Sequence, residues 1–69
     1  MEDFSVRLRK IRMDQRKKQR EVADCLDLKL RSYQTYEQGK NEPNIEKLIL
    51  LADFFDVSLD YLMGRTDAP

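Results

Sequence analysis

Four polar side chains between Leu30 and Gln38 have the types and the spacing to bind the edges of nucleic-acid bases. At about 100° per helical residue they share one outward arc, while Tyr33 and Tyr36 point the other way. Arginine can bind guanine through two hydrogen bonds, glutamine can bind adenine in the same way, and threonine can offer its methyl group to thymine. A leucine at the start of the helix can also contact a thymine methyl group. The expected base-contacting residues are Leu30, Arg31, Gln34, Thr35 and Gln38. The plain alternative is a solvated helix face.

A cluster of cations precedes and opens an expected helix at Gln19–Leu26. The positive end of a helix dipole disfavours cations, and no hydroxyl residue is present to cap this helix. A phosphate group bound there would satisfy the free backbone N–H groups and the cations together. Further cations and an amide flank the outward arc of the next helix. The expected phosphate-contacting residues are Lys17, Lys18, Arg20, Lys29, Lys40 and Asn41.

The formal net charge of zero conceals a gradient along the chain. The first 20 residues hold eight basic and three acidic side chains, whereas residues 42–69 hold two basic and six acidic ones. A domain polarised in this way can present one face to a polyanion and turn the other away. Within the basic part, a solvated helix face explains Arg7, Arg9 and Lys10 as well as phosphate contact does.

Most enzyme chemistry is excluded by composition. The 69 residues include no histidine and one cysteine, Cys25. Nucleophile–histidine pairs and imidazole zinc sites are therefore impossible, and one thiol can form neither an internal disulfide nor a four-thiolate cage. No apolar run is long enough to span a membrane, and we expect no secretion leader. We expect no catalytic residue, metal, cofactor or small-molecule ligand, and a cytoplasmic location.

The apolar spacing predicts an all-α chain of five short helices in one domain, residues 1–64, followed by a frayed tail, residues 65–69. The expected helices run from Phe4 to between Asp14 and Arg16, from Gln19 to Leu26, from Leu30 to Gln38, from Ile45 to Phe55, and from Leu59 to Gly64. Asp3, Asn44 and Ser58 are expected N-caps. The three-residue connection at 27–29 suits a sharp crossing of the second and third helices, which is the geometry of a helix-turn-helix.

Residues 19–40 resemble the helix-turn-helix of the lambda-repressor-like (Cro/CI-type, XRE) DNA-binding family, and the resemblance extends over nearly the whole chain. The matching positions are Gln19, Ala23, Leu26, Tyr33, Tyr36, Glu37 and Gly39. The resemblance implies a compact five-helix domain. It also implies that Gln19 contacts a phosphate and that Arg12 and Glu37 form a structural salt bridge.

The sequence departs from the family pattern at three places. Asp27 stands where the family usually has the glycine of the turn. Lys17 and Lys18 replace the usual Leu-Thr before the glutamine, and residues 29–31 are Lys-Leu-Arg where small polar residues are common. The first departure bears on stability, and the other two bear on DNA contact.

The expected fourth helix has a broad apolar arc that includes Ile45, Leu48 and Ile49, and a second apolar pair, Leu50 and Phe54, on its other side. Either the fifth helix and the tail cover this pair, or it is an exposed patch for a partner. In the second case it would form a homodimer contact together with Tyr61 or Met63.

The resemblance implies a sequence-specific regulator of transcription that binds a double-stranded DNA operator, as a repressor and as a homodimer on DNA. Two alternatives remain open at this point. One is a protein-interaction module, similar to an antitoxin, that uses the apolar patch of the fourth helix. The other is a nonspecific DNA-binding domain.

Overall fold

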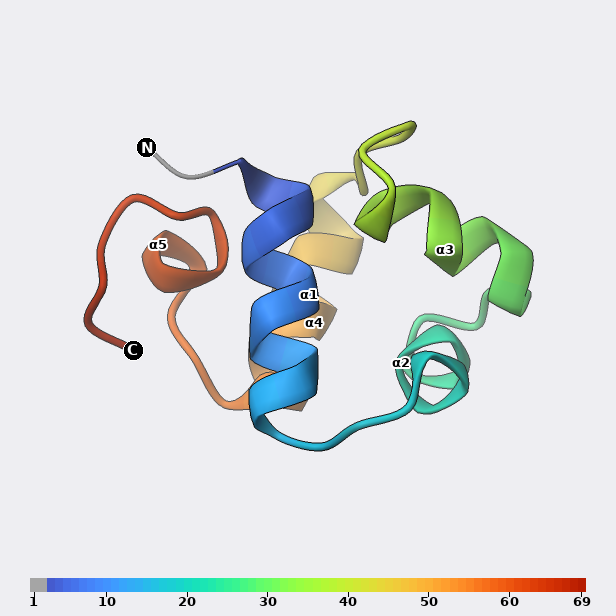
Figure 1. Ribbon diagram of the computed structural model, residues 1–69, viewed down its shortest axis with the longest axis horizontal. Helices are drawn as coiled ribbons and strands as arrows, with labels where there is room; N and C mark the ends of the chain where they lie inside the picture. Colours follow the sequence, from blue (N-terminus) through green and yellow to red (C-terminus); the bar gives the residue numbers. More distant parts are fainter. Residues whose placement is uncertain (1–2) are drawn as a thin grey trace.

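The computed structural model describes residues 3–69 and contains five helices in this part of the chain. Helix α1 spans Phe4–Asp14, α2 Gln19–Cys25, α3 Leu30–Glu37, α4 Ile45–Phe55 and α5 Leu59–Leu62. The predicted all-α class is confirmed, and each helix lies within two residues of its expected bounds. Helix α1 runs through the centre with α4 behind it, while α2 and α3 lie to one side and α5 to the other (Figure 1).

The helix ends show why the chain breaks where it does. Asn44 and Ser58 cap α4 and α5, because their side chains accept hydrogen bonds from the backbone N–H groups of Lys47 and Tyr61 at 2.9 and 3.0 Å. Asp3 precedes α1 as expected, although its side chain caps no backbone N–H of that helix. Between α2 and α3, Asp27 has the left-handed backbone angle φ 55°, which closes the turn.

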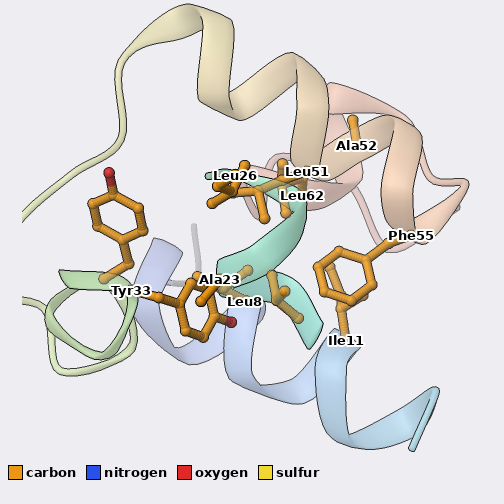
Figure 2. Packing of buried hydrophobic residues seen from close by; sticks show 11 residues of the cluster. Leu8, Ile11, Ala23, Leu26, Tyr33, Leu51, Ala52, Phe55 and Leu62 are labelled. Atoms are coloured by element: carbon orange, nitrogen blue, oxygen red, sulfur yellow. The ribbon is translucent and has the colours of Figure 1, made fainter. Parts of the chain in front are cut away.

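The core is formed by side chains from all five helices (Figure 2). Tyr33, Phe55, Leu8 and Leu51 are its largest fully buried members. Leu28, in the turn between α2 and α3, packs against this cluster while remaining half-buried. The turn is thereby joined to the core, which fixes the direction in which α3 leaves it.

The expected burial along α4 is wrong at two positions. Ile45 and Ile49 belong to the apolar arc expected to face the core, yet they are 74% and 45% exposed. The other members of the expected arc do face the core: Leu51, Ala52 and Phe55 are buried, and Leu48 is half-buried. In a domain this small, α4 packs on one side only, so its buried arc is narrower than its apolar stripe.

The C-terminal segment expected to be frayed has partners in the structure. The Ser58 N–H donates to the carbonyl of Pro69 at 3.0 Å, and Asp67 forms an ion pair with Arg7 of α1 at 3.0 Å. Two residues of this largely exposed segment thus contact the rest of the fold, Asp67 at α1 and Pro69 at the N-cap of α5, on the side of the molecule away from α3 (Figure 1).

Candidate nucleic-acid interface

Helix α3 has the two faces that its sequence predicts. Tyr33 and Tyr36 are buried against the core, and their rings meet edge to face with centroids 6.2 Å apart. On the outer side Arg31 and Gln38 are exposed, whereas Leu30, Gln34 and Thr35 are half-buried. The expected base-contacting side chains thus remain accessible, with different degrees of freedom.

Thr35 forms hydrogen bonds within its own helix and with the following loop. Its hydroxyl donates to the carbonyl of Ser32 at 2.6 Å and accepts a longer bond from the Asn41 amide at 3.5 Å. Its own carbonyl accepts from the N–H groups of Lys40 and Asn41. Thr35 therefore ties the end of α3 to the following loop, and Gly39, with φ 76°, allows the chain to fold back there.

A shallow groove of about 590 Å³ opens where α1, α2 and α3 meet. It is lined by Arg9, Arg12, Lys18, Gln19, Gln34, Glu37 and Gln38. Two expected base-contacting residues, Gln34 and Gln38, thus share one opening with two expected phosphate-contacting residues, Lys18 and Gln19. Arg9, which sequence reasoning left undecided, also lines this groove, because α1 passes beside α3.

The Glu37 carboxylate is the centre of a hydrogen-bond network under this groove. Arg12 of α1 donates to its two oxygens at 2.6 and 3.0 Å, so the salt bridge implied by the resemblance is present. The Tyr33 hydroxyl and the Gln19 amide, the latter at 3.1 Å, also donate to it. Burial raises the pKa of Glu37, but the hydrogen bonds from Arg12, Tyr33 and Gln19 outweigh burial and hold this pKa below its usual value. The carboxylate is therefore ionised and has abundant donors.

Gln19 connects this network to the outer face of α3. Its amide nitrogen donates to Glu37, and its amide oxygen accepts from the side-chain nitrogen of Gln34 at 3.1 Å. Sequence reasoning assigned Gln19 to phosphate contact through the resemblance and did not foresee these bonds. The family resemblance implies neither a contact between Gln19 and Gln34 nor a hydrogen bond from the Tyr33 hydroxyl.

The N-terminus of α2 is better stabilised than the sequence suggests. The Glu21 carboxylate accepts a hydrogen bond from the backbone N–H of Lys18 at 2.9 Å, so this N–H group has a partner. The negative charge of the carboxylate also interacts favourably with the positive end of the helix dipole. Lys18 and Arg20 are exposed at this end of the helix. A glutamate three residues after the N-cap is the sequence pattern that predicts this contact.

The remaining expected phosphate contacts divide into two groups. Lys29, Lys40 and Asn41 are exposed at the two ends of α3. Lys17 lies elsewhere, because its ammonium group stands over the Phe54 ring of α4 at 5.6 Å from the ring centroid. The structure therefore does not bring Lys17 into the groove with Lys18 and Gln19.

Arg7 is removed from the phosphate candidates by its surroundings. The residue is 3% exposed, its guanidinium pairs with Asp67, and it stacks over the Tyr61 ring at 4.5 Å. It binds α1 to α5 and the tail, on the side away from the groove. Arg7 is therefore a buried cation and does not belong to a solvated helix face.

The expected apolar patch is not a single surface. Leu50 is 44% exposed, whereas Phe54 is half-buried between Lys17 and the Phe55 ring, 5.1 Å away. Tyr61 lies beneath Arg7, and Met63 lines a separate opening beside Phe4. Neither α5 nor the tail covers Leu50, so the exposed alternative holds for this residue.

Other kinds of site find little support in the described part of the chain. In residues 3–69 no group of three or more cysteine, aspartate or glutamate side chains is arranged to hold a metal ion. Burial raises the pKa of the Cys25 thiol, which favours its unreactive protonated form. No helix among these residues is both long and apolar enough to cross a bilayer.

Comparisons with known proteins agree with this geometry. Residues 8–62 match a family model described as helix-turn-helix. The chain is 36% identical over 66 residues to the HTH-type transcriptional regulator YobD of Bacillus subtilis, covering 96% of this chain and 59% of YobD. It is 41% identical over 49 residues to the cryptic phage CTXphi transcriptional repressor RstR of Vibrio cholerae, covering 71% of this chain and 44% of RstR. A crystal structure of a transcriptional regulator from Listeria innocua superposes with a TM-score of 0.84 at 34% identity, covering 90% of this chain and 58% of that one.

Proposed function

Because this chain belongs to the lambda-repressor-like helix-turn-helix family, we propose that it binds double-stranded DNA sequence-specifically and regulates transcription as a repressor. The chain spans little more than half the length of the curated relatives it matches first, 59% of YobD and 52% of YqaE, so this proposal concerns the DNA-binding unit. Its mechanism is occupancy: a bound operator is closed to polymerase. We propose that the protein acts at the nucleoid, in the cytoplasm of a bacterium, and that it catalyses no reaction.

The groove at the junction of α1, α2 and α3 is the observation that carries the proposal. It gathers amides that can read bases, Gln34 and Gln38, and cations that can hold a phosphate backbone, Lys18 and Arg9. Phosphate contacts set the register of a protein on a duplex, and base contacts give its specificity. With α3 in the major groove, both kinds of contact fall on one face of the molecule.

We also propose that two copies bind one operator. A two-fold pair would place its two α3 helices about 34 Å apart, on successive turns of one side of the duplex. Leu50 and the exposed edge of Phe54 supply an apolar contact on α4 for such a pair. Tyr61 and Met63 are left outside it, since they lie under Arg7 and beside Phe4 respectively.

Selection from random duplexes, followed by fluorescence anisotropy on the sequence recovered, tests the proposal. We expect a preference of about 10³-fold or more over random duplex, with an affinity that falls steeply with salt. Arg31→Ala should relax the base preference, whereas Lys18→Ala should weaken all sequences equally and lower the salt slope by about 1.

Two other outcomes would contradict the proposal. Equal binding to every duplex would identify a nonspecific DNA-binding domain. No binding even at low salt would favour a protein-interaction module similar to an antitoxin, which would use the exposed apolar residues of α4.

A further inference from the structure

Hydrogen bonds join Gln34 to Gln19 and Gln19 to Glu37. The negative charge of Glu37 fixes which group donates in each of these bonds. An ionised carboxylate accepts hydrogen bonds and cannot donate one. The Glu37 side chain is 5% exposed and paired with Arg12 at 2.6 Å, which keeps it ionised. The Gln19 group that faces it at 3.1 Å must therefore be the NH₂ group.

The orientation of the Gln19 amide also determines which group of the Gln34 amide faces it. With its nitrogen turned to Glu37, Gln19 presents its oxygen to α3, so the Gln34 group 3.1 Å away must also be an NH₂. One N–H of Gln34 is used in this way, and its carbonyl oxygen and second N–H remain. Because Gln34 is half-buried and lines the groove, these two groups are what it offers to a ligand there.

An amide held in this orientation distinguishes the two purines. In the major groove adenine presents a donor, its N6 amino group, beside the acceptor N7, whereas guanine presents two acceptors, O6 and N7. A glutamine that rotates freely can turn its nitrogen toward guanine. A glutamine whose nitrogen is held by Gln19 keeps its oxygen outward, where guanine O6 would oppose it.

We propose that Gln19, anchored on the buried Glu37 carboxylate, is a positioning residue that orients Gln34 to select adenine over guanine at one base pair of the operator. This inference rests on the proposed function and deepens it. It changes the role of Gln19, which orients a base-reading side chain instead of holding a phosphate.

The first arm of the test needs no variant that perturbs the fold. Each adenine of the selected operator is replaced in turn by purine, which lacks the N6 amino group, and by guanine. Wild-type protein should lose affinity by roughly tenfold at one base pair with either replacement. Gln34→Ala, at a half-exposed position, should bind the original and both replaced duplexes with equal affinity at that base pair.

The second arm isolates Gln19. Gln19→Met keeps the length of the side chain and removes its polar atoms, and circular dichroism checks that the helices remain. The preference for adenine at the same base pair should fall by roughly tenfold, and Gln19→Met with Gln34→Ala should lose no more than Gln34→Ala alone. Gln15→Met, which makes the same exchange at an exposed glutamine outside the groove, should leave that preference intact.

The outcomes separate this inference from the function beneath it. If Gln19→Met weakens all duplexes equally and lowers the salt slope, Gln19 is a phosphate contact and the inference is wrong while the regulator remains. If wild-type protein tolerates the loss of the N6 amino group at every adenine, the inference is also wrong, whether or not Gln19→Met folds. If wild-type protein selects no sequence at all, both proposals are overturned.

Discussion

The phenolic hydroxyl of Tyr33 donates a hydrogen bond to the Glu37 carboxylate, one turn further along α3. Tyr33 is fully buried, and burial together with the adjacent carboxylate raises the pKa of its hydroxyl well above the usual value. The inner face of α3 is therefore bonded through the same carboxylate that holds Arg12 of α1 and Gln19 of α2. One anionic side chain joins three helices at the point where they frame the groove.

Tyr33→Phe should destabilise the fold. It removes a hydrogen bond to a buried charged group, which typically contributes about 2 kcal/mol, and urea denaturation measures the loss. Tyr36→Phe removes the same atom from the neighbouring buried aromatic of α3, which has no role in the Glu37 network, and should change stability little. An equal loss in both variants would show that the ring edge, and not the bond to Glu37, matters.

Stability should fall in acid because of Glu37. Its pKa is lower in the folded protein than the ordinary value of 4.5, so the unfolded chain binds the proton more readily. The stabilisation is therefore complete above pH 4.5 and is lost as the pH falls through the folded pKa. Thermal melts of the wild type across pH 2–7 should show this fall.

Glu37→Gln should remove that part of the pH dependence and cost about 3–5 kcal/mol at neutral pH, since Arg12 keeps its charge without an anionic partner. Glu46→Gln, at an exposed position on α4, is the matched control and should follow the wild-type curve. Parallel curves for wild type and Glu37→Gln would contradict the assignment.

Asp27→Gly should stabilise the turn between α2 and α3. Asp27 holds a left-handed backbone with φ 55°, which strains a residue that has a Cβ atom. Glycine relieves that strain, and we expect a gain of up to about 1 kcal/mol in urea denaturation. Asp24→Gly makes the same exchange inside α2, where glycine has the lower helix propensity, and should destabilise the fold by about 0.3 kcal/mol. A loss at both positions would mean that the Asp27 side chain itself stabilises the turn.

Arg9→Gln should weaken DNA binding without changing base preference. Arg9 lines the groove beside Lys18, so it can neutralise one phosphate and release one counterion. The slope of log affinity against log salt should decrease by about 1. Arg65→Gln removes an exposed cation after α5, across the molecule from α3, and should leave the slope unchanged. Equal slopes for Arg9→Gln and wild type would remove Arg9 from the interface.

Leu50→Lys should abolish self-association on operator DNA, as measured by sedimentation. A buried lysine in an apolar contact between copies has no partner for its charge. Ile45→Lys places the same charge on the most exposed apolar residue of α4, about 140° around the helix from Leu50, and should leave the dimer intact. A wild-type protein that stays monomeric on the operator would contradict the proposed pair.

The fold was predictable because its determinants are local. Asn44 and Ser58 act through their own helix ends, and the glycine after α3 takes the positive φ that its position requires. The Arg12–Glu37 pair is 25 residues apart in the chain and could be expected only through the family resemblance. Spacing within one helix contains no information about which cation faces it from another.

The remaining features depend on tertiary packing. Periodicity marks Ile45 and Ile49 as apolar but does not tell how wide a face α4 buries. Arginine is usually a surface residue, and the burial of Arg7 beneath its neighbours, with its guanidinium over the Tyr61 ring, depends on how α5 packs against α1. The contact of Gln19 with Gln34 requires the positions of α2 and α3 relative to each other, to within an ångström.

The start of α2, with Lys18 and Arg20, and the α5–tail segment, with Asp60 and Asp67, lie on opposite sides of α1, so part of the charge gradient along the sequence is also a separation in space (Figure 1). Such a molecule has a permanent dipole moment that a polyanion can turn as the two approach. A molecule that approaches DNA with its acidic side first would be turned by the field of the DNA, within about one Debye length, until its basic side faces the duplex. Added salt should therefore slow the arrival of this protein at DNA while leaving its residence time comparatively unaffected.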